Sequence, residues 1–217
     1  NCTSIPMTMA LAPLQDRFGV EVVIASSMQA LSGAGYPGVP SLDAVDNVIP
    51  FVAESEETKM NDEPNKMLGR FNGQQVEAAS ITVSAHCNRV PVSDGHLVTV
   101  SVRFREKASL GDILRAWQTW EPLAQQLTLP SAPQPPLLIR SEPNRPQPRL
   151  DRDAGGGMAT SVGRLRPCPV LDVRFVALAH NTIRGAAGGS VLNAELMAAQ
   201  GMLDQFKRKE ASLHVST

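Results

Sequence analysis

Apolar residues recur at helical spacing near the start of the chain, at Met7, Leu11 and Leu14. Thr3 or Ser4 can cap the helix that this pattern predicts, and Gly19 can end it. The stretch "SLGDILRAWQTW" is also amphipathic and predicts a helix that starts at Ser109. The chain is therefore expected to contain an N-terminal helix and another near its middle.

Three further segments have helical features. The stretch "SLDAVDNVIPFV" predicts a short helix capped by Ser41 and ended by Pro50. The charged segment "ESEETKMNDEPNKML" is partly helical and typical of a solvated face. A last helix carries an apolar stripe made of Leu192, Leu196, Ala199, Leu203 and Phe206.

Runs rich in β-branched residues predict several strands. The run from Val22 to Ala25 predicts a buried strand. The stretches "MATSVGRLR" and "LDVRFVALAH" predict two more strands. The runs "ITVSAHCNRVPV" and "HLVTVSVRF" are joined by Ser-Asp-Gly and predict a β-hairpin. On that hairpin Arg89 and His96 would share one face, about 13 Å apart at about 3.3 Å per residue. The pattern alone favours an exposed face with scattered polar residues.

Two loops stand out between these elements. Ser32 to Gly38 is rich in small residues, which lets a ligand approach the backbone closely. Pro130 to Pro148 is rich in proline and too long for a tight turn. We expect it to be an ordered excursion over the surface or over a partner subunit.

Composition permits one large domain and argues against nucleic acid and a membrane as partners. The chain has 217 residues, 42% of them hydrophobic, and its 20 basic residues are offset by 21 acidic ones. No basic face for nucleic acid and no membrane span are expected. The cysteines, Cys2, Cys87 and Cys168, are odd in number and far apart, which favours reduced thiols in the cytoplasm.

Cys2 stands directly before the first predicted helix. Free amide hydrogens at a helix start favour an anion, so we expect the pKa of this thiol to be lowered and the thiolate to be nucleophilic. The alternative is a small apolar residue near a fraying chain end. A zinc site from His86, Cys87 and His96 lacks the usual ligand spacing, so no metal is expected.

Five motifs occur in order along the chain: "NCT", "MQALSGAGYPG", "CNRVPVSDGH", "RPQPRLDRDAGGGMATSVGRLR" and "HNTIRGAAGGSVLNAEL". Together they resemble aspartate-semialdehyde dehydrogenase, and most of all the branch common in archaea and fungi. The resemblance covers nearly the whole chain. It implies an α+β fold with a mixed, largely antiparallel sheet and helices on one face, like the C-terminal domain of glyceraldehyde-3-phosphate dehydrogenase-like enzymes.

The resemblance also implies a domain organisation. In this family the catalytic cysteine follows an N-terminal Rossmann domain with a glycine-rich fingerprint, whereas "GAGYPG" here is not followed by a suitable βαβ unit. The chain therefore resembles the C-terminal part. We expect residues 1–185 to be a catalytic and dimerisation domain, 186–208 a helix that packs on the missing cofactor domain, and 209–217 a polar tail.

The family resemblance assigns roles to residues that match its motifs. It makes Cys2 the nucleophile that forms an acyl-thioester and His96 the general acid/base, since a histidine has an ordinary pKa near working pH. Arg89 becomes the clamp for the substrate carboxylate, because its planar fork suits that group. Gln29 would orient the substrate beside the cysteine.

Further roles follow from the same resemblance. Glu56 would meet the substrate ammonium and Lys59 the phosphate. The cofactor would be NADP, supplied as NADPH, with most contacts in the missing N-terminal domain. The residues expected to touch it in this chain are Ser32, Gly33 and Asn181.

The implied reaction is the reduction of aspartyl 4-phosphate to aspartate 4-semialdehyde, a step in lysine, methionine and threonine biosynthesis. Substrate and phosphate are the expected small-molecule partners, and the assembly is a homodimer or a dimer of dimers. The chain alone is expected to be inactive. A malonyl-CoA or related acyl-CoA reductase, with the same Cys, His and Arg, is the first alternative. A non-catalytic dimerisation module is the second.

Overall fold

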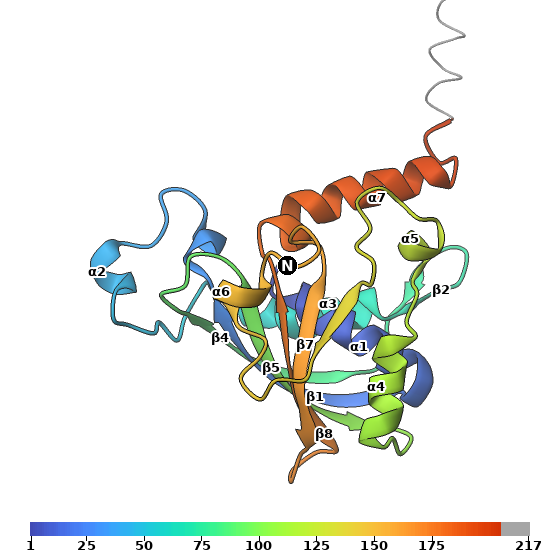
Figure 1. The fold of residues 1–217 in the computed structure, drawn as a ribbon, viewed down its shortest axis with the longest axis horizontal. Coiled ribbons are helices and arrows are strands. Elements are labelled where there is room, and N and C mark those ends of the chain that lie inside the picture. Colours follow the sequence, from blue (N-terminus) through green and yellow to red (C-terminus); the bar gives the residue numbers. More distant parts are fainter. Residues whose placement is uncertain (205–217) are drawn as a thin grey trace, which may run out of the picture.

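A computed structural model describes residues 1–204 of the chain (Figure 1). Its strands are β1 (Val20–Gln29), β2 (Arg70–Phe71), β3 (Val76–Glu77), β4 (Thr82–Arg89), β5 (His96–Phe104), β6 (Leu137–Arg140), β7 (Thr160–Pro167) and β8 (Val173–Ala179). Its α-helices are α1 (Ser4–Phe18), α2 (Ser41–Ala44), α3 (Glu56–Met67), α4 (Leu110–Gln118), α5 (Leu123–Gln126), α6 (Pro148–Asp151) and α7 (Gly188–Ala199). A 3₁₀ turn, η1 (Leu31–Ala34), and a π-helical turn, η2 (Ile183–Ala187), complete the described elements.

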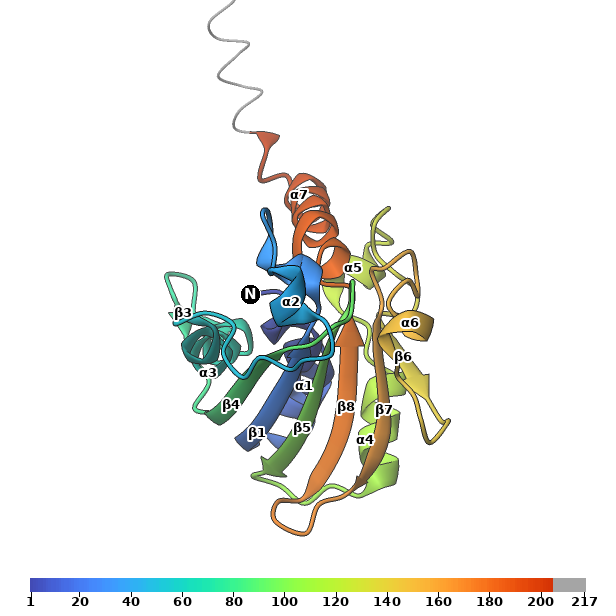
Figure 2. The same cartoon turned by 90° about the vertical axis from the view of Figure 1, so that its left-hand side faces the viewer.

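Six strands form one sheet in the order β4-β1-β5-β8-β7-β6, seen face-on in Figure 2. The pairs β1–β4 and β6–β7 are parallel, and the other three pairs are antiparallel. Helices α1 and α4 lie behind this sheet in Figure 2, on the same face. The expected α+β fold with a mixed, largely antiparallel sheet is confirmed. Strands β2 and β3 form a separate two-stranded sheet.

The core lies between the sheet and helices α1 and α4. The stripe that predicted α1 is fully buried: Met7, Leu11 and Leu14. Trp117 of α4 donates from Nε1 to the Ala10 carbonyl at 2.9 Å, and its ring meets Phe175 of β8 edge-on with centroids 5.2 Å apart. Burial of each such side chain stabilises the fold by about 1.5–3 kcal/mol, so this layer holds α1 in place.

The predicted β4–β5 hairpin is wrong, because β1 lies between these two strands. Residues 90–93 bond to the end of β1 and to the residues that follow it, so the connection from β4 to β5 is not a hairpin turn. Val90 N donates to Gln29 O at 3.0 Å, and Leu31 N donates to Val92 O at 2.7 Å. These hydrogen bonds satisfy the connecting backbone. Arg89 and His96 therefore come from strands that flank β1 rather than from one hairpin face.

The ends of the predicted helices are only partly as expected. Gly19 does end α1, with φ +65°. Thr3 occupies the N-cap position of α1, but its side chain makes no capping hydrogen bond. The hydroxyls of Thr3 and Ser4 are both buried without a hydrogen-bond partner. Ser109 caps α4 as predicted, in a reciprocal capping box with Asp112.

Two other segments differ from the prediction. The helix expected up to Pro50 is the four-residue α2, and Pro40, not Ser41, is its N-cap residue. The proline-rich excursion is ordered but contains β6, which pairs with β7 in the main sheet. Prolines flank this strand at the sheet edge, where missing N–H donors are tolerated.

Helix α7 lies beyond the end of the sheet in both views, and in Figure 1 it crosses above α5 (Figures 1 and 2). Leu192 and Leu196 pack against Leu129 and Met158, which form a small separate cluster. The helix ends at Ala199, so Leu203 lies in a turn beyond it. Phe206, the end of the expected 186–208 helix and the 209–217 tail lie outside the described residues. Within the described range, no helix has the length and apolarity needed to span a membrane.

Candidate active site

A cavity of about 420 Å³ opens between Cys2, the start of α3, the ends of β1 and β4, and residues of the 33–53 segment. Four of the residues assigned from the family resemblance line it: Cys2, Gln29, Glu56 and Arg89. Gly33, expected at the cofactor, lines it too. These residues are separated by up to 87 positions in the sequence, and the fold brings them around one space.

Glu56 lines the cavity, although the charge pattern of its helix taken alone is typical of a solvated face. Its Oε2 accepts from Gln29 Nε2 at 3.2 Å and from Asn1 Nδ2 at 3.0 Å. Gln29 is 2% exposed, so this network is buried on the strand side. Asn1 was not predicted to take part. Its place in the "NCT" motif, directly before the cysteine, was the signal that could have found it.

Arg89 is a nearly buried cation at the end of β4. Its Nη1 donates to the Ala30 carbonyl at 2.6 Å, which leaves the remaining nitrogens of the fork for a ligand. Burial lowers the pKa of this guanidinium, while the charge of Glu56 opposes that shift. A planar cation held in this way suits a carboxylate.

His96 is fully buried at the start of β5. Its Nδ1 accepts from Ala30 N–H at 3.1 Å, so the neutral ring carries its proton on Nε2. That Nε2 has no hydrogen-bond partner among the described residues. Burial, followed by the nearby charge of Arg89, lowers the pKa of His96 to about 3. The expectation of a pKa near working pH is therefore wrong for this state, and the side chain is a neutral Nε2–H donor.

Gly33 separates Arg89 from His96. A Cβ at this position would lie 2.8 Å from Arg89 Nη1 and 2.9 Å from His96 Nε2. Both distances are shorter than any ordinary contact, so the lack of a side chain lets the two groups face the same space. Arg89 and His96, far apart on the predicted hairpin, are thus neighbours across Gly33.

We expect Gly33→Ala to push Arg89 and His96 apart. The predicted effect is a loss of about 1–3 kcal/mol in unfolding free energy from overpacking and at least about a 10-fold fall in kcat of the complete enzyme. Thermal unfolding and steady-state kinetics measure both. Gly111→Ala is the matched control, since a Cβ there meets only Ser109 Oγ at 3.7 Å. Unchanged kinetics in Gly33→Ala would refute the steric argument.

Ser32 and Asn181 are also brought together. Asn181 Nδ2 donates to Ser32 Oγ at 2.8 Å, and Asn181 Oδ1 accepts from Gly95 N–H at 2.8 Å. Asn181 is 2% exposed and so links the turn before His96 to the loop that contains Ser32 and Gly33. Asn181 therefore ties Ser32, the first residue of the small-residue loop, to the turn before His96.

Cys2 packs against Gly185, where a Cβ would lie 2.7 Å from Cys2 Cβ. Burial raises the pKa of this thiol, and the negative charge of Glu56 adds to the effect. The predicted lowering of the Cys2 pKa by the helix start is therefore wrong, because desolvation of the thiolate outweighs the favourable groups around it. By contrast, hydrogen bonds from residues of its own loop lower the pKa of Cys168, although burial opposes them.

Lys59, expected among the substrate-binding residues, is not at the cavity, and the residues of the zinc site considered and rejected above lie in different surroundings. Lys59 is exposed on α3 and is not among the residues that line the cavity. His86 is exposed on β4, whereas Cys87 is buried with its Sγ 3.5 Å from Met60 Sδ. Within residues 1–204, no cluster of three or more His, Cys, Asp or Glu side chains could hold a metal ion.

The chain is similar to proteins of known family. A family model described as semialdehyde dehydrogenase, dimerisation domain, matches residues 11–184. Aspartate-semialdehyde dehydrogenase from Archaeoglobus fulgidus is 52% identical over 197 residues, which is 91% of this chain and 56% of that protein. The Aspergillus fumigatus enzyme of that name is 46% identical over 212 residues, 94% of this chain and 58% of that protein.

A solved structure agrees with the sequence relatives. The crystal structure of aspartate semialdehyde dehydrogenase with NADP from Candida albicans matches with a TM-score of 0.84 and 39% identity, over 93% of this chain and 57% of that one. The chain thus spans 56% to 58% of the length of these relatives. With a family model over most of its length and relatives of such identity, the chain belongs to the semialdehyde dehydrogenase family.

Proposed function

We propose that the chain is the catalytic and dimerisation part of an enzyme that reduces aspartyl 4-phosphate to aspartate 4-semialdehyde with NADPH, on the route to lysine, threonine and methionine. One observation carries the proposal. Cys2, Gln29, Glu56 and Arg89 meet around one cavity, and the unpartnered Nε2 of His96 lies beside Gly33 of the same cavity. The names of the relatives support this reaction.

Cys2 would attack the acyl carbon and displace phosphate. A carbon–sulfur bond forms, the carbon–oxygen bond to phosphate breaks, and the departing phosphate takes the thiol proton. A phosphate group as proton acceptor suits Cys2, because the raised pKa of this thiol keeps it protonated before substrate arrives. The product of this step is an acyl-thioester on Cys2.

Substrate would be held by groups of opposite charge. Arg89 keeps one nitrogen on the Ala30 carbonyl and offers the others to the substrate carboxylate. Glu56 uses Oε2 for Gln29 and Asn1, so Oε1 is available to the substrate ammonium. Lys59, one turn along α3 from Glu56, is the proposed phosphate ligand. Two fixed charges at the cavity would place the acyl carbon near the thiol.

Reduction of the thioester requires an added hydride and a polarised carbonyl. A nicotinamide cofactor supplies the hydride when bound. Ser32 and Asn181 present an hydroxyl and an amide, and Gly33 leaves space beside them, which fits the nicotinamide end of such a cofactor. His96 would donate its Nε2–H to the carbonyl oxygen as negative charge develops there. Collapse of the resulting tetrahedral oxyanion breaks the carbon–sulfur bond, releases the aldehyde and leaves a Cys2 thiolate, which takes up a proton from solvent.

The proposed assembly is a homodimer formed through the open face of the sheet. The family model describes a dimerisation domain, and α1 and α4 lie on the other face. On the open face the β5 side chains Leu97, Thr99 and Ser101 are half-buried. The free thiols of Cys2, Cys87 and Cys168 support a reducing compartment, the cytoplasm.

The test of this function compares substrates in the complete enzyme. We expect turnover of aspartyl phosphate with NADPH and, in reverse, phosphate-dependent oxidation of aspartate semialdehyde. Turnover of malonyl-CoA in place of aspartyl phosphate would favour the acyl-CoA reductase alternative. Activity with neither substrate would favour the non-catalytic module.

The chain of residues 1–217 by itself is expected to fold but not to complete a catalytic cycle. It spans 56% to 58% of its relatives, and Ser32, Gly33 and Asn181 offer the cofactor only a few contacts. Calorimetry with NADPH should give no micromolar binding, and a coupled assay with aspartate semialdehyde and phosphate should give no turnover. Micromolar binding or measurable turnover by this chain would contradict the prediction.

A further inference from the structure

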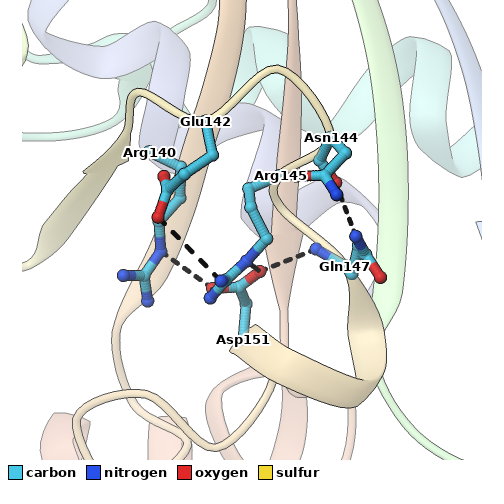
Figure 3. Close-up of polar contacts among 6 residues, drawn as sticks. All are labelled: Arg140, Glu142, Asn144, Arg145, Gln147 and Asp151. Carbon is cyan, nitrogen blue, oxygen red and sulfur yellow. Dashed lines mark hydrogen bonds and ion pairs between the residues drawn. The ribbon is translucent and has the colours of Figure 1, made fainter.

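Asp151 is the centre of a buried charge cluster outside the cavity described above (Figure 3). Its side chain is 0% exposed, and Arg140 Nε lies 2.8 Å from Oδ1. Arg145 Nε donates to Oδ2 at 2.7 Å, and the Gln147 backbone N–H donates to the same oxygen at 2.7 Å. One carboxylate thus joins the end of β6, the following loop and the start of α6.

The cluster keeps Asp151 charged. Burial alone would raise the pKa of this carboxyl, but hydrogen bonds from Arg145 and Gln147 and the charge of Arg140 outweigh burial and lower it. A buried carboxylate of this kind is weak evidence for stability, because apolar residues of similar volume often stabilise a fold as well or better. The geometry that the cluster imposes on its neighbours is the more informative property.

Helix α6 connects the cluster to the turn that precedes His96. Arg152 follows Asp151 directly in the chain, and its Nη1 donates to Ser93 Oγ at 2.9 Å and to the Asp94 carbonyl at 3.3 Å. Asp151 and Arg152 are adjacent in the chain, but the side chain of Asp151 bonds to the cluster and the side chain of Arg152 bonds to the turn. Movement of α6 would therefore move the turn.

The turn also packs directly on α6. Gly95, with φ +97°, approaches so closely that a Cβ there would lie 3.1 Å from Arg152 Cβ and 3.4 Å from Pro148 Cβ. On its other side the turn supports the small-residue loop, since Ser93 O accepts from Ser32 N–H at 3.1 Å. The residue after Gly95 is His96, so the position of this turn sets where β5 begins.

We propose that Asp151 is a positioning residue, which acts through Arg152 and the Ser93–Gly95 turn to fix the direction of the His96 imidazole. Among the described residues, the hydrogen bonds and ion pairs of the Asp151 side chain reach no cavity residue, so its effect on them passes through α6 and Arg152. The structural effect of Asp151 is on the His96 side chain alone. Its consequence for catalysis rests on the proposed function.

The first arm of the test measures the NMR signals of the His96 ring nitrogens and does not depend on enzyme activity. In the chain of residues 1–217 labelled with ¹⁵N-histidine, NMR should show His96 with a bare Nδ1 and a protonated Nε2, and His96→Asn assigns those signals. We expect Asp151→Asn to shift or split them at pH 7. Asp112→Asn is the matched control, because it makes the same chemical change in the capping box of α4 and should leave the His96 signals in place.

A second variant keeps the test decisive if Asp151→Asn does not fold. Arg152→Gln keeps the Asp151 cluster and removes the hydrogen bonds to the turn, so it should shift the same His96 signals in the same direction. The double variant should shift them no further than the larger single change. Unchanged His96 signals in Arg152→Gln, or in a folded Asp151→Asn, would overturn the proposal and leave the cluster a purely structural one.

The second arm measures kinetics in the complete enzyme, normalised to active sites titrated at Cys2. We expect Asp151→Asn to lower kcat by about 10- to 100-fold, the scale of a small misplacement, with KM changed by less than about threefold. Equal kcat per titrated site in variant and wild type would contradict the positioning role. A wild-type enzyme inactive on aspartyl phosphate would refute the proposed function, while the NMR arm would still decide the role of Asp151.

Discussion

Cys2→Ala in the complete enzyme is expected to lower kcat by about four orders of magnitude or more, because the acyl-thioester cannot form without the sulfur. Cys2 lines the cavity together with Arg89 and Glu56, so no other cysteine can substitute for it: Cys87 is buried against Met60. Steady-state rates with aspartyl phosphate and NADPH measure the loss. Intact-mass analysis after exposure to substrate should find the adduct on Cys2.

Cys168→Ala is the matched control for this variant and should keep normal kcat. The pKa of the Cys168 thiol is lowered, whereas burial raises that of Cys2. A small non-specific thiol reagent at neutral pH is therefore expected to reach Cys168 first in the chain alone, and a substrate analogue to reach Cys2 in the complete enzyme. A substrate-derived adduct on Cys168 or Cys87 would contradict the assignment of the nucleophile.

His96→Ala is expected to lower kcat by roughly two to four orders of magnitude, because the variant loses the donor that stabilises the developing oxyanion. The imidazole is fully buried with a free Nε2–H, so its removal takes away a fixed donor beside the reacting carbonyl. Arg89→Lys is the contrast: it keeps the charge but loses the planar fork, so it should mainly raise KM. Near-normal turnover by His96→Ala would show that the proposed role is wrong.

The same histidine should make folding sensitive to acid. The pKa of His96 is lowered to about 3 in the folded chain, below its ordinary unfolded value of about 6.5. The unfolded state therefore binds more protons between these values, and the free energy of unfolding falls as pH drops from about 6.5 toward about 3, by up to about 1.4 kcal/mol per pH unit.

Thermal unfolding across this range measures the acid sensitivity. His96→Asn is the suitable variant, because an amide oxygen can still accept from Ala30 N–H while the titrating group is gone. Its unfolding free energy should depend less on pH below about 6.5 than that of the wild type. Parallel pH curves for the two proteins would contradict the lowered pKa.

Local patterns were enough to predict much of the scaffold. The spacing of Met7, Leu11 and Leu14 predicted the inward face of α1, and Ser109 predicted the start of α4. Both depend on residues within one or two helical turns, where period and capping act directly. The resemblance of the ordered motifs identified five of the residues that line the cavity, Cys2, Gln29, Gly33, Glu56 and Arg89, but it assigned them roles without a geometry.

Several features of the site could not be read from neighbouring residues. Glu56 lies in a charged helix typical of a solvated face, yet it accepts from Gln29, 27 positions away. Lys59, one turn further on, remains outside the cavity lining. Which side of a polar helix faces a ligand depends on what packs beside it, and that information is not contained in the helix.

The sequence by itself determined the class of fold, the inward faces of α1 and α4 and the identity of the family. Only the tertiary structure decided that β1 lies between β4 and β5, and so that Arg89 and His96 face each other across Gly33. Only the tertiary structure likewise decided the directions of the pKa shifts of Cys2 and His96. The physical reason is the same in both cases: strand pairing and desolvation depend on groups that are distant in the sequence, whereas helix period and capping depend on near neighbours.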